Sequence, residues 1–150
     1  MRAGAFWQDM VVGERLRTGR RTITESDLVG FITAAGFFEP LFLDAEFAPA
    51  QGIYAGRLVP GALTFAYAEG LVIQTGVIHG TGLAFLGTDL RVEGPVVVGD
   101  TIEVEVEVTE ARASSTAGRG VVTTRNRVFN QRGDVVMTYS PVRLVRGADA

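Results

Sequence analysis

The 150-residue chain carries 14 basic and 17 acidic residues, which gives a net charge of -3, and 47% of its residues are hydrophobic. It has no cysteine and one histidine, which excludes disulfides, thiolate nucleophiles and a histidine-based zinc site. Its length fits one domain with a substantial core, and its weak acidic balance offers no bulk electrostatic argument for binding nucleic acid. We therefore expect neither a metal nor a nucleic-acid partner.

The first segment, residues 1–14, is predicted to be an arm that docks on the domain. Its large apolar residues are Phe6, Trp7, Met10 and Val11, and Gly13 ends it. The segment lacks the basic-then-apolar order of a signal peptide, so we expect a cytoplasmic protein with no membrane partner.

A strand and a helix are predicted next. Residues 15–24 alternate in part and contain β-branched side chains, which favours a strand. Thr24 is a candidate N-cap, and Asp27 stands three positions later, as in a capping box. Apolar residues then follow at helical spacing until Gly36, which is a natural C-terminal stop.

Residues 37–58 are broken up by prolines and glycines and are predicted to form a long irregular segment. Asp44 is a candidate N-cap for a short helical turn within it. Tyr54 either donates a hydrogen bond to a ligand or packs. Segments of this length without a regular element are often functional.

Residues 59–75 are predicted to form a central helix, with Pro60 and Gly61 near its start and Glu69 as its only charge. The run is too short to cross a bilayer and too apolar for a surface helix, so a sheet is expected to wrap around it. Glu69 needs a partner or a raised pKa if it is buried; otherwise it faces solvent or an interface. His79 follows the helix, where a turn or strand-edge role is favoured over catalysis.

Four antiparallel strands are predicted after this helix, over residues 82–92, 100–111, 118–130 and 135–145. The second alternates strictly, with Glu103, Glu105 and Glu107 on one face. Arg125 and Arg127 on the third can pair with them if the two strands are neighbours. The order of elements predicts one α+β domain over residues 1–150, an antiparallel curved sheet around a central apolar helix, which is the hot-dog arrangement. The tail, residues 146–150, is expected to be frayed.

Several segments of the chain resemble the MaoC-like dehydratases, the family of (R)-specific enoyl-CoA hydratases. These segments cover nearly the whole chain after residue 10, in the order ITESDLVGFITAAG, PLFLDAEFA, RLVPGALT, GPVVVGDTIEVEVEV and GRGVVTTRNRVFNQRGDVVM. The resemblance implies addition of water to a trans-2-enoyl thioester, or the reverse reaction. That reaction needs a base, an acid and a group that stabilises the enolate oxygen.

Members of this family supply the acid and base with an Asp and a His five positions apart, in a pattern like G-D-x-N-P-x-H-x-D. On this chain Gly36, Pro40 and Asp44 match the pattern. Phe37 stands at the Asp position and Phe42 at the His position, so the resemblance implies that the usual acid/base pair is missing. The two rings either line an acyl pocket or fill the core.

Two carboxylates remain as weak substitutes for the missing pair. Glu39 and Asp44 are five positions apart, like the family's pair, but shifted by two. The alternative, which we favour, is that Asp44 caps a turn and Glu39 is exposed.

The resemblance also implies a platform for the thioester at the start of the central helix, where Pro60-Gly61 replaces the family's His-Gly. The N–H groups of Gly61 and Ala62 would hold the carbonyl oxygen, and the ligand would run along residues 37–54. The candidate substrate-binding residues are thus Phe37, Phe42, Tyr54, Pro60, Gly61 and Ala62. No cofactor is implied beyond acyl-CoA as substrate or ligand.

Three functions stay open at this point. The first is a hot-dog protein that binds an acyl-CoA thioester as a homodimer or higher oligomer, without the usual hydratase chemistry. The second is a non-catalytic subunit of a heteromer, in which another hot-dog chain brings the Asp and His. The third is an active hydratase or thioesterase that uses Glu39, Asp44 or Glu69. Whether the chain is itself an enzyme is left open.

Overall fold

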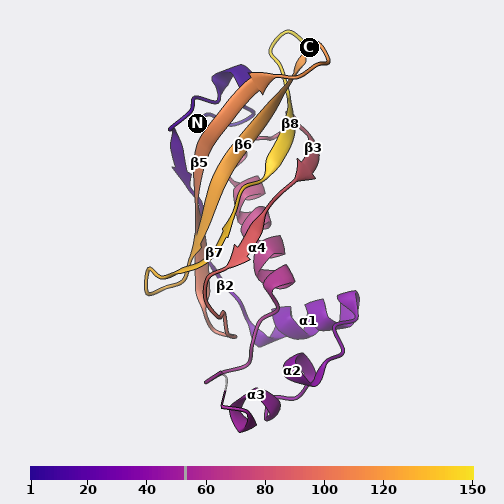
Figure 1. The fold of residues 1–150 in the computed structure, drawn as a ribbon, viewed down its shortest axis with the longest axis vertical. Helices are drawn as coiled ribbons and strands as arrows, with labels where there is room; N and C mark the ends of the chain where they lie inside the picture. Colours follow the sequence, from indigo (N-terminus) through magenta and orange to yellow (C-terminus); the bar gives the residue numbers. More distant parts are fainter. Residues whose placement is uncertain (53) are drawn as a thin grey trace.

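The computed structural model describes residues 1–52 and 54–150. Within these residues, eight strands form one antiparallel sheet that curves around the helix α4 (Gly61–Gln74), which confirms the predicted α+β arrangement (Figure 1). Three short helices, α1 (Glu25–Ala35), α2 (Pro40–Leu43) and α3 (Phe47–Ala50), gather at the end where α4 begins. Across the described ranges, every helix is too short or too polar to cross a membrane.

The sheet is built around two long strands, β5 (Thr101–Ala113) and β6 (Arg119–Phe129). These two strands pair with each other. The short strands β1 (Arg15–Arg17) and β2 (Arg21–Thr22) pair with β5 along the edge that faces away from β6. β6 is flanked along one half by β7 (Val135–Tyr139) and along the other by β8 (Val142–Arg146). The outer strands are β3 (Gly82–Gly87), which pairs with β8, and β4 (Leu90–Val92), which pairs with β7.

The core lies between the concave face of the sheet and α4. The alternation predicted for β5 is confirmed, since its side chains are buried at every second position, at Ile102, Val104, Val106 and Val108. α4 contributes its own buried face, which includes Leu63, Ala68 and Leu71. The apolar face of α4 and the apolar face of β5 thereby bury each other.

The opposite face of β5 is acidic and is matched by arginines on both neighbouring strands. Glu107 lies 3.9 Å from Arg125 of β6, and Glu105 pairs with Arg127, as the sequence predicted. Arg17 of β1 adds a further partner, at 3.1 Å from Glu103. Cross-strand pairs of opposite charge support the register of the sheet.

Two of the predicted strands are each divided in two. Residues 82–92 form β3 and β4, and residues 135–145 form β7 and β8. Pro141 has no N–H for a strand ladder, and the N–H of Ser140 donates instead to the Asp89 carboxylate at 3.1 Å. The prediction of four continuous strands after the central helix is therefore wrong, because these two segments are interrupted at residues 88–89 and 140–141, although β7 and β8 share the neighbour β6.

The capping prediction for α1 is confirmed in detail. The Thr24 hydroxyl accepts from the N–H of Asp27 at 3.1 Å, and the Asp27 carboxylate accepts from the N–H of Thr24 at 2.9 Å. Gly36 ends the helix in the left-handed region, at φ 75°. Asp44 caps a turn as predicted, since its carboxylate accepts from the N–H of Glu46 at 2.9 Å; the helix α3 begins after that turn, at Phe47.

Both ends of the chain pack on the end of the sheet that lies away from α1, α2 and α3 (Figure 1). Met10 is buried as predicted, whereas Val11 is exposed, and Trp7 packs on Gly120 of β6. The tail is held rather than frayed, since the N–H of Gly147 donates to Gly118 at 2.8 Å and that of Ala148 to the Gln8 side chain at 3.2 Å.

Candidate functional site

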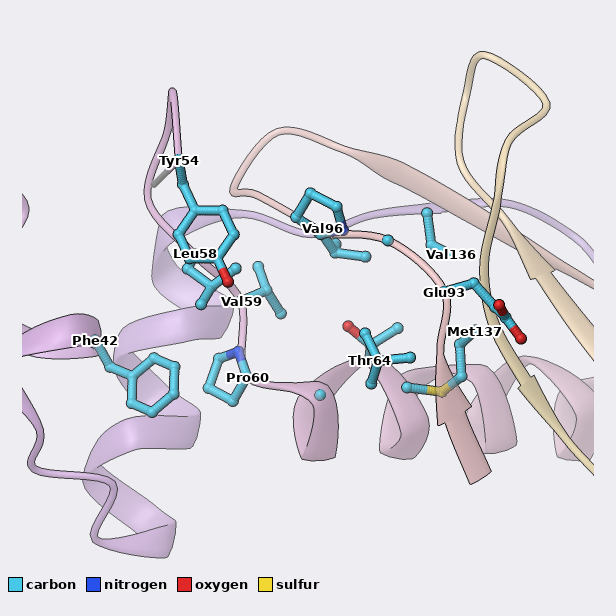
Figure 2. A pocket seen from close by; sticks show the side chains of 14 residues that line it. Phe42, Tyr54, Leu58, Val59, Pro60, Thr64, Glu93, Val96, Val136 and Met137 are labelled. Carbon is cyan, nitrogen blue, oxygen red and sulfur yellow. The ribbon is translucent and has the colours of Figure 1, made fainter. Parts of the chain in front are cut away.

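A cavity of about 310 Å³ opens at the N-terminal end of α4 (Figure 2). Phe42, Tyr54 and residues 58–61 form one wall. Residues 92–96, with Val136 and Met137 of β7, form the other. Thr64 lies between them on α4. The lining is mostly apolar, as is typical of pockets for small organic ligands.

The start of α4 offers free hydrogen-bond donors at this cavity. Pro60 is the N-cap residue and has no side-chain donor or acceptor for the helix end. Its carbonyl accepts from the N–H groups of Leu63 and Thr64, at 3.0 and 3.2 Å. Within the described part of the chain, the N–H groups of Gly61 and Ala62 have no partner. These donors and the positive end of the helix dipole suit an oxygen that carries negative charge.

The rings of Phe37 and Phe42 lie side by side. The Phe37 and Phe42 rings are 6.0 Å apart, and Phe37 also meets Phe31 of α1 edge-on at 5.1 Å. Both rings are partly buried and pack against the core; Phe42 also lines the cavity, whereas Phe37 is outside the lining. Of the two roles that the sequence left open, Phe42 therefore combines both, whereas Phe37 packs against the core alone.

Arg57 holds the short helix α2, which carries Phe42. Its guanidinium donates to the carbonyl of Phe42 at 3.1 Å and to the Glu25 carboxylate of α1 at 2.7 Å. The side chain is 19% exposed. Arg57 therefore fixes Phe42 relative to α1, a role that nothing in the local sequence indicates.

The other predicted ligand-contacting residues are distributed around the same opening. Tyr54, Pro60 and Gly61 line the cavity, while Ala62 is the next residue of α4 and is exposed. Ile53, within the predicted ligand-binding loop, lies outside the described residues. The structure thus brings the start of α4, Tyr54 and Phe42 together.

The carboxylates proposed as substitutes lie elsewhere. Glu39 and Asp44 are exposed and do not line the cavity. Glu93 is the carboxylate among the described lining residues, and sequence reasoning missed it. Figure 2 shows its oxygens at the far side of the cavity from Pro60. Within the described residues, no three His, Cys, Asp or Glu side chains cluster as a metal site would require.

Glu69 has the partners that its burial requires. It accepts from the Tyr139 hydroxyl at 2.8 Å and from the Arg143 guanidinium at 2.6 Å. Burial, together with the charge of Glu69, raises the pKa of Tyr139. His79 is exposed after the other end of α4. Both residues lie outside the cavity lining, so Glu69 joins α4 to the sheet instead of serving this site.

Sequence reasoning also missed the wall formed by β4, the turn after it and β7. These strands are far from the central helix in sequence, and no local pattern indicates that Val92, Val96 or Met137 faces a cavity. Thr64 did have a usable signal, since it is a hydroxyl in the first turns of an otherwise apolar helix.

The sequence of the chain is similar to a known family and to known proteins. The family described as the FAS1-like dehydratase domain region matches residues 10–139. The (R)-specific enoyl-CoA hydratase of Aeromonas caviae is 32% identical over 135 residues, which cover 90% of this chain and 95% of that protein. Three further curated relatives are longer, and the chain spans 30%, 64% and 43% of their lengths.

Solved structures agree with these sequence matches. A monoamine oxidase regulatory protein from Archaeoglobus fulgius superposes with a TM-score of 0.89 at 33% identity, covering 98% of this chain and 97% of that one. A MaoC-like dehydratase from Rhodospirillum rubrum gives 0.85 at 28% identity, over 98% and 100% of the two chains. A Mycobacterium tuberculosis protein with a double hotdog fold gives 0.82 at 20% identity, over 97% and 45%, a likeness of fold alone. The chain therefore belongs to the MaoC-like dehydratase and (R)-specific enoyl-CoA hydratase family, and it has the hot-dog fold.

Proposed function

We propose that this protein binds an acyl-CoA or related acyl thioester, with the thioester oxygen at the N–H groups of Gly61 and Ala62. The observation that carries the proposal is the pair of backbone N–H groups without a partner at the start of α4, where a mostly apolar cavity opens. The named activities of its relatives support the choice of ligand, since they include an enoyl-CoA hydratase and a 3-hydroxybutyryl-CoA dehydratase.

We propose in addition that ordinary hydratase turnover is weak or absent. Neither Phe37 nor Phe42 can transfer a proton, and the side chains able to titrate among the described lining residues are Tyr54 and Glu93. A positioned acid or base contributes about 10² to 10⁴ in rate, so turnover should lie below that of an active hydratase by about that factor.

The test is to measure binding and turnover of crotonyl-CoA by the same preparation. We expect binding by calorimetry together with little loss of the enoyl absorbance. Introducing Phe37→Asp with Phe42→His should raise the rate of that loss, because the pair restores an acid and a base beside the cavity.

The chain offers a matched control for this double variant. Phe38 and Leu43 are also five positions apart and are 64% and 49% exposed. Phe38→Asp with Leu43→His makes the same chemical change away from the cavity and should leave turnover low. Rapid hydration of crotonyl-CoA by the unmodified protein would contradict the proposal that its hydratase turnover is weak or absent. Failure to bind any acyl-CoA would contradict the proposed ligand.

A second copy of the chain is the proposed partner. The outer strands β3 and β4 present Leu83, Phe85, Leu86 and Val92 at 47–60% exposure. Exposed apolar edge strands favour association. Val92 also lines the cavity, so a copy seated on this edge would help to close the site. The alternative occupant is a hot-dog chain that carries the Asp and His, and co-purification with such a chain would favour the heteromer.

A further inference from the structure

The hydroxyl of Thr64 is not accounted for by the fold. Thr64 is 2% exposed, and among the described residues its Oγ1 has no hydrogen-bond partner. A buried hydroxyl without a partner lowers stability, because it loses its bonds to water and gains none in return. Such a group in a native structure needs an explanation, and a bound ligand is one.

The usual local partner of a helical threonine is not used here. A threonine in a helix can donate to the carbonyl four residues earlier, which for Thr64 is that of Pro60. That carbonyl instead accepts from two backbone N–H groups, those of Leu63 and Thr64 itself. The hydroxyl therefore remains available to a group in the cavity that Thr64 lines.

The hydroxyl is placed one helical turn beyond the free donors of the helix start. Side chains on a helix tilt toward its N-terminus, and positions three apart share a face. Thr64 thus lies over the turn that begins at Gly61, displaced from it by about 4.5 Å along the axis. Figure 2 shows its oxygen on the side of the residue toward Val59 and Pro60.

We propose that the Thr64 hydroxyl determines specificity by hydrogen bonding to an oxygen substituent at C3 of the bound acyl chain. The inference rests on the proposed function, which puts the thioester oxygen at Gly61 and Ala62. C3 is two carbon–carbon bonds from the thioester carbon, a span that leads from the helix start toward the next turn. The surrounding walls there are apolar, with Val59, Val96 and Met137, so Thr64 is the polar group that such a substituent meets.

The test compares two CoA thioesters that differ only at C3. Calorimetry with 3-hydroxybutyryl-CoA and butyryl-CoA should give a preference of about fivefold for the hydroxylated ligand, the size expected of one net hydrogen bond. Thr64→Val keeps the shape and removes the hydroxyl, so it should abolish the preference while the affinity for butyryl-CoA changes less than twofold. Thr64→Ser keeps the hydroxyl and should keep the preference. The enoyl absorbance is followed in parallel to exclude turnover.

A second readout separates recognition from a structural role. Without ligand, Thr64→Val should unfold at the same or a higher temperature, because it removes an unsatisfied buried hydroxyl. If the variant is less stable and the ligand preference is unchanged, Thr64 is structural and the inference is overturned. Thr64→Ala, which also lacks the hydroxyl, replaces the valine variant if that one does not fold. Equal binding of the two ligands by the unmodified protein overturns the Thr64 role alone, whereas no binding of either overturns the proposed function as well.

Discussion

At the scale of single residues, Gly120 leaves the least room for change. A Cβ added at this position of β6 would lie 2.2 Å from Cγ of Trp7, which packs flat against the strand. Gly120→Ala should therefore lower the free energy of unfolding by about 1–3 kcal/mol, the usual penalty of overpacking. Urea unfolding followed by tryptophan fluorescence measures it.

Gly19→Ala is the matched control for that substitution. A Cβ at Gly19 meets nothing within 4 Å and its φ is not positive, so the same chemical change should be nearly neutral. Equal effects of the two substitutions would show that the contact between the arm and the sheet contributes nothing to stability.

These residues differ in how far local sequence predicts them. The Thr24–Asp27 cap is a contact over three positions, and the sequence pattern alone identified it. The contacts of Gly120 with Trp7 and of Arg57 with Phe42 join residues that are far apart in the sequence, and no helical or strand periodicity predicts them. Side-chain roles that depend on such distant partners were therefore missed.

At the scale of the elements, the start of α1 is the feature with a clear pH dependence. The backbone N–H of Thr24 is the main cause that holds the pKa of Asp27 at about 2, below its ordinary value of 3.8, and Tyr67 and Arg21 add to it. Because the folded pKa is the lower one, the ionised carboxylate stabilises the fold above about pH 4. That contribution is lost as the pH falls through about 2.

Asp27→Asn should accordingly be less stable than the unmodified protein at pH 7, by about 1–2 kcal/mol, the usual cost of a lost cap. The difference should shrink between pH 4 and pH 2, as measured by thermal unfolding at each pH. Glu46→Gln, at an exposed side chain, serves as control and should show no such trend. A difference that stays constant down to pH 2 would contradict the role of the charge.

The elements themselves were predictable where one periodicity ran along the whole of them. The apolar run of α4 and the alternation of β5 each report a single burial pattern, and both elements formed as predicted. The divided strands β3/β4 and β7/β8 were missed because their breaks are short local interruptions, at residues 88–89 and 140–141, within segments whose strand neighbours stay the same. An alternating pattern continues across such a break and does not register it.

At the scale of the whole molecule, the exposed edge formed by β3 and β4 leads to a test of assembly. The unmodified protein should be a dimer by light scattering coupled to gel filtration. Leu86→Glu, at a side chain that is 55% exposed, should shift it to monomer, because a charge would be buried against the partner. Val12→Glu, at 61% exposure on the N-terminal arm, should leave the dimer intact. A monomeric unmodified protein would exclude this edge as a homodimer interface.

The sequence by itself determined the α+β hot-dog architecture, the central helix with its free N-terminus, and the family, because these depend on local periodicity, caps and short motifs. Only the tertiary structure decided which side chains meet at the cavity. It put Phe42 but not Phe37 in the wall, placed Glu93 rather than Glu39 or Asp44 at the lining, and left Thr64 without a partner among the described residues. The physical reason is that a pocket is formed by segments distant in sequence, and the direction of a side chain in an irregular loop follows from packing that no single segment encodes.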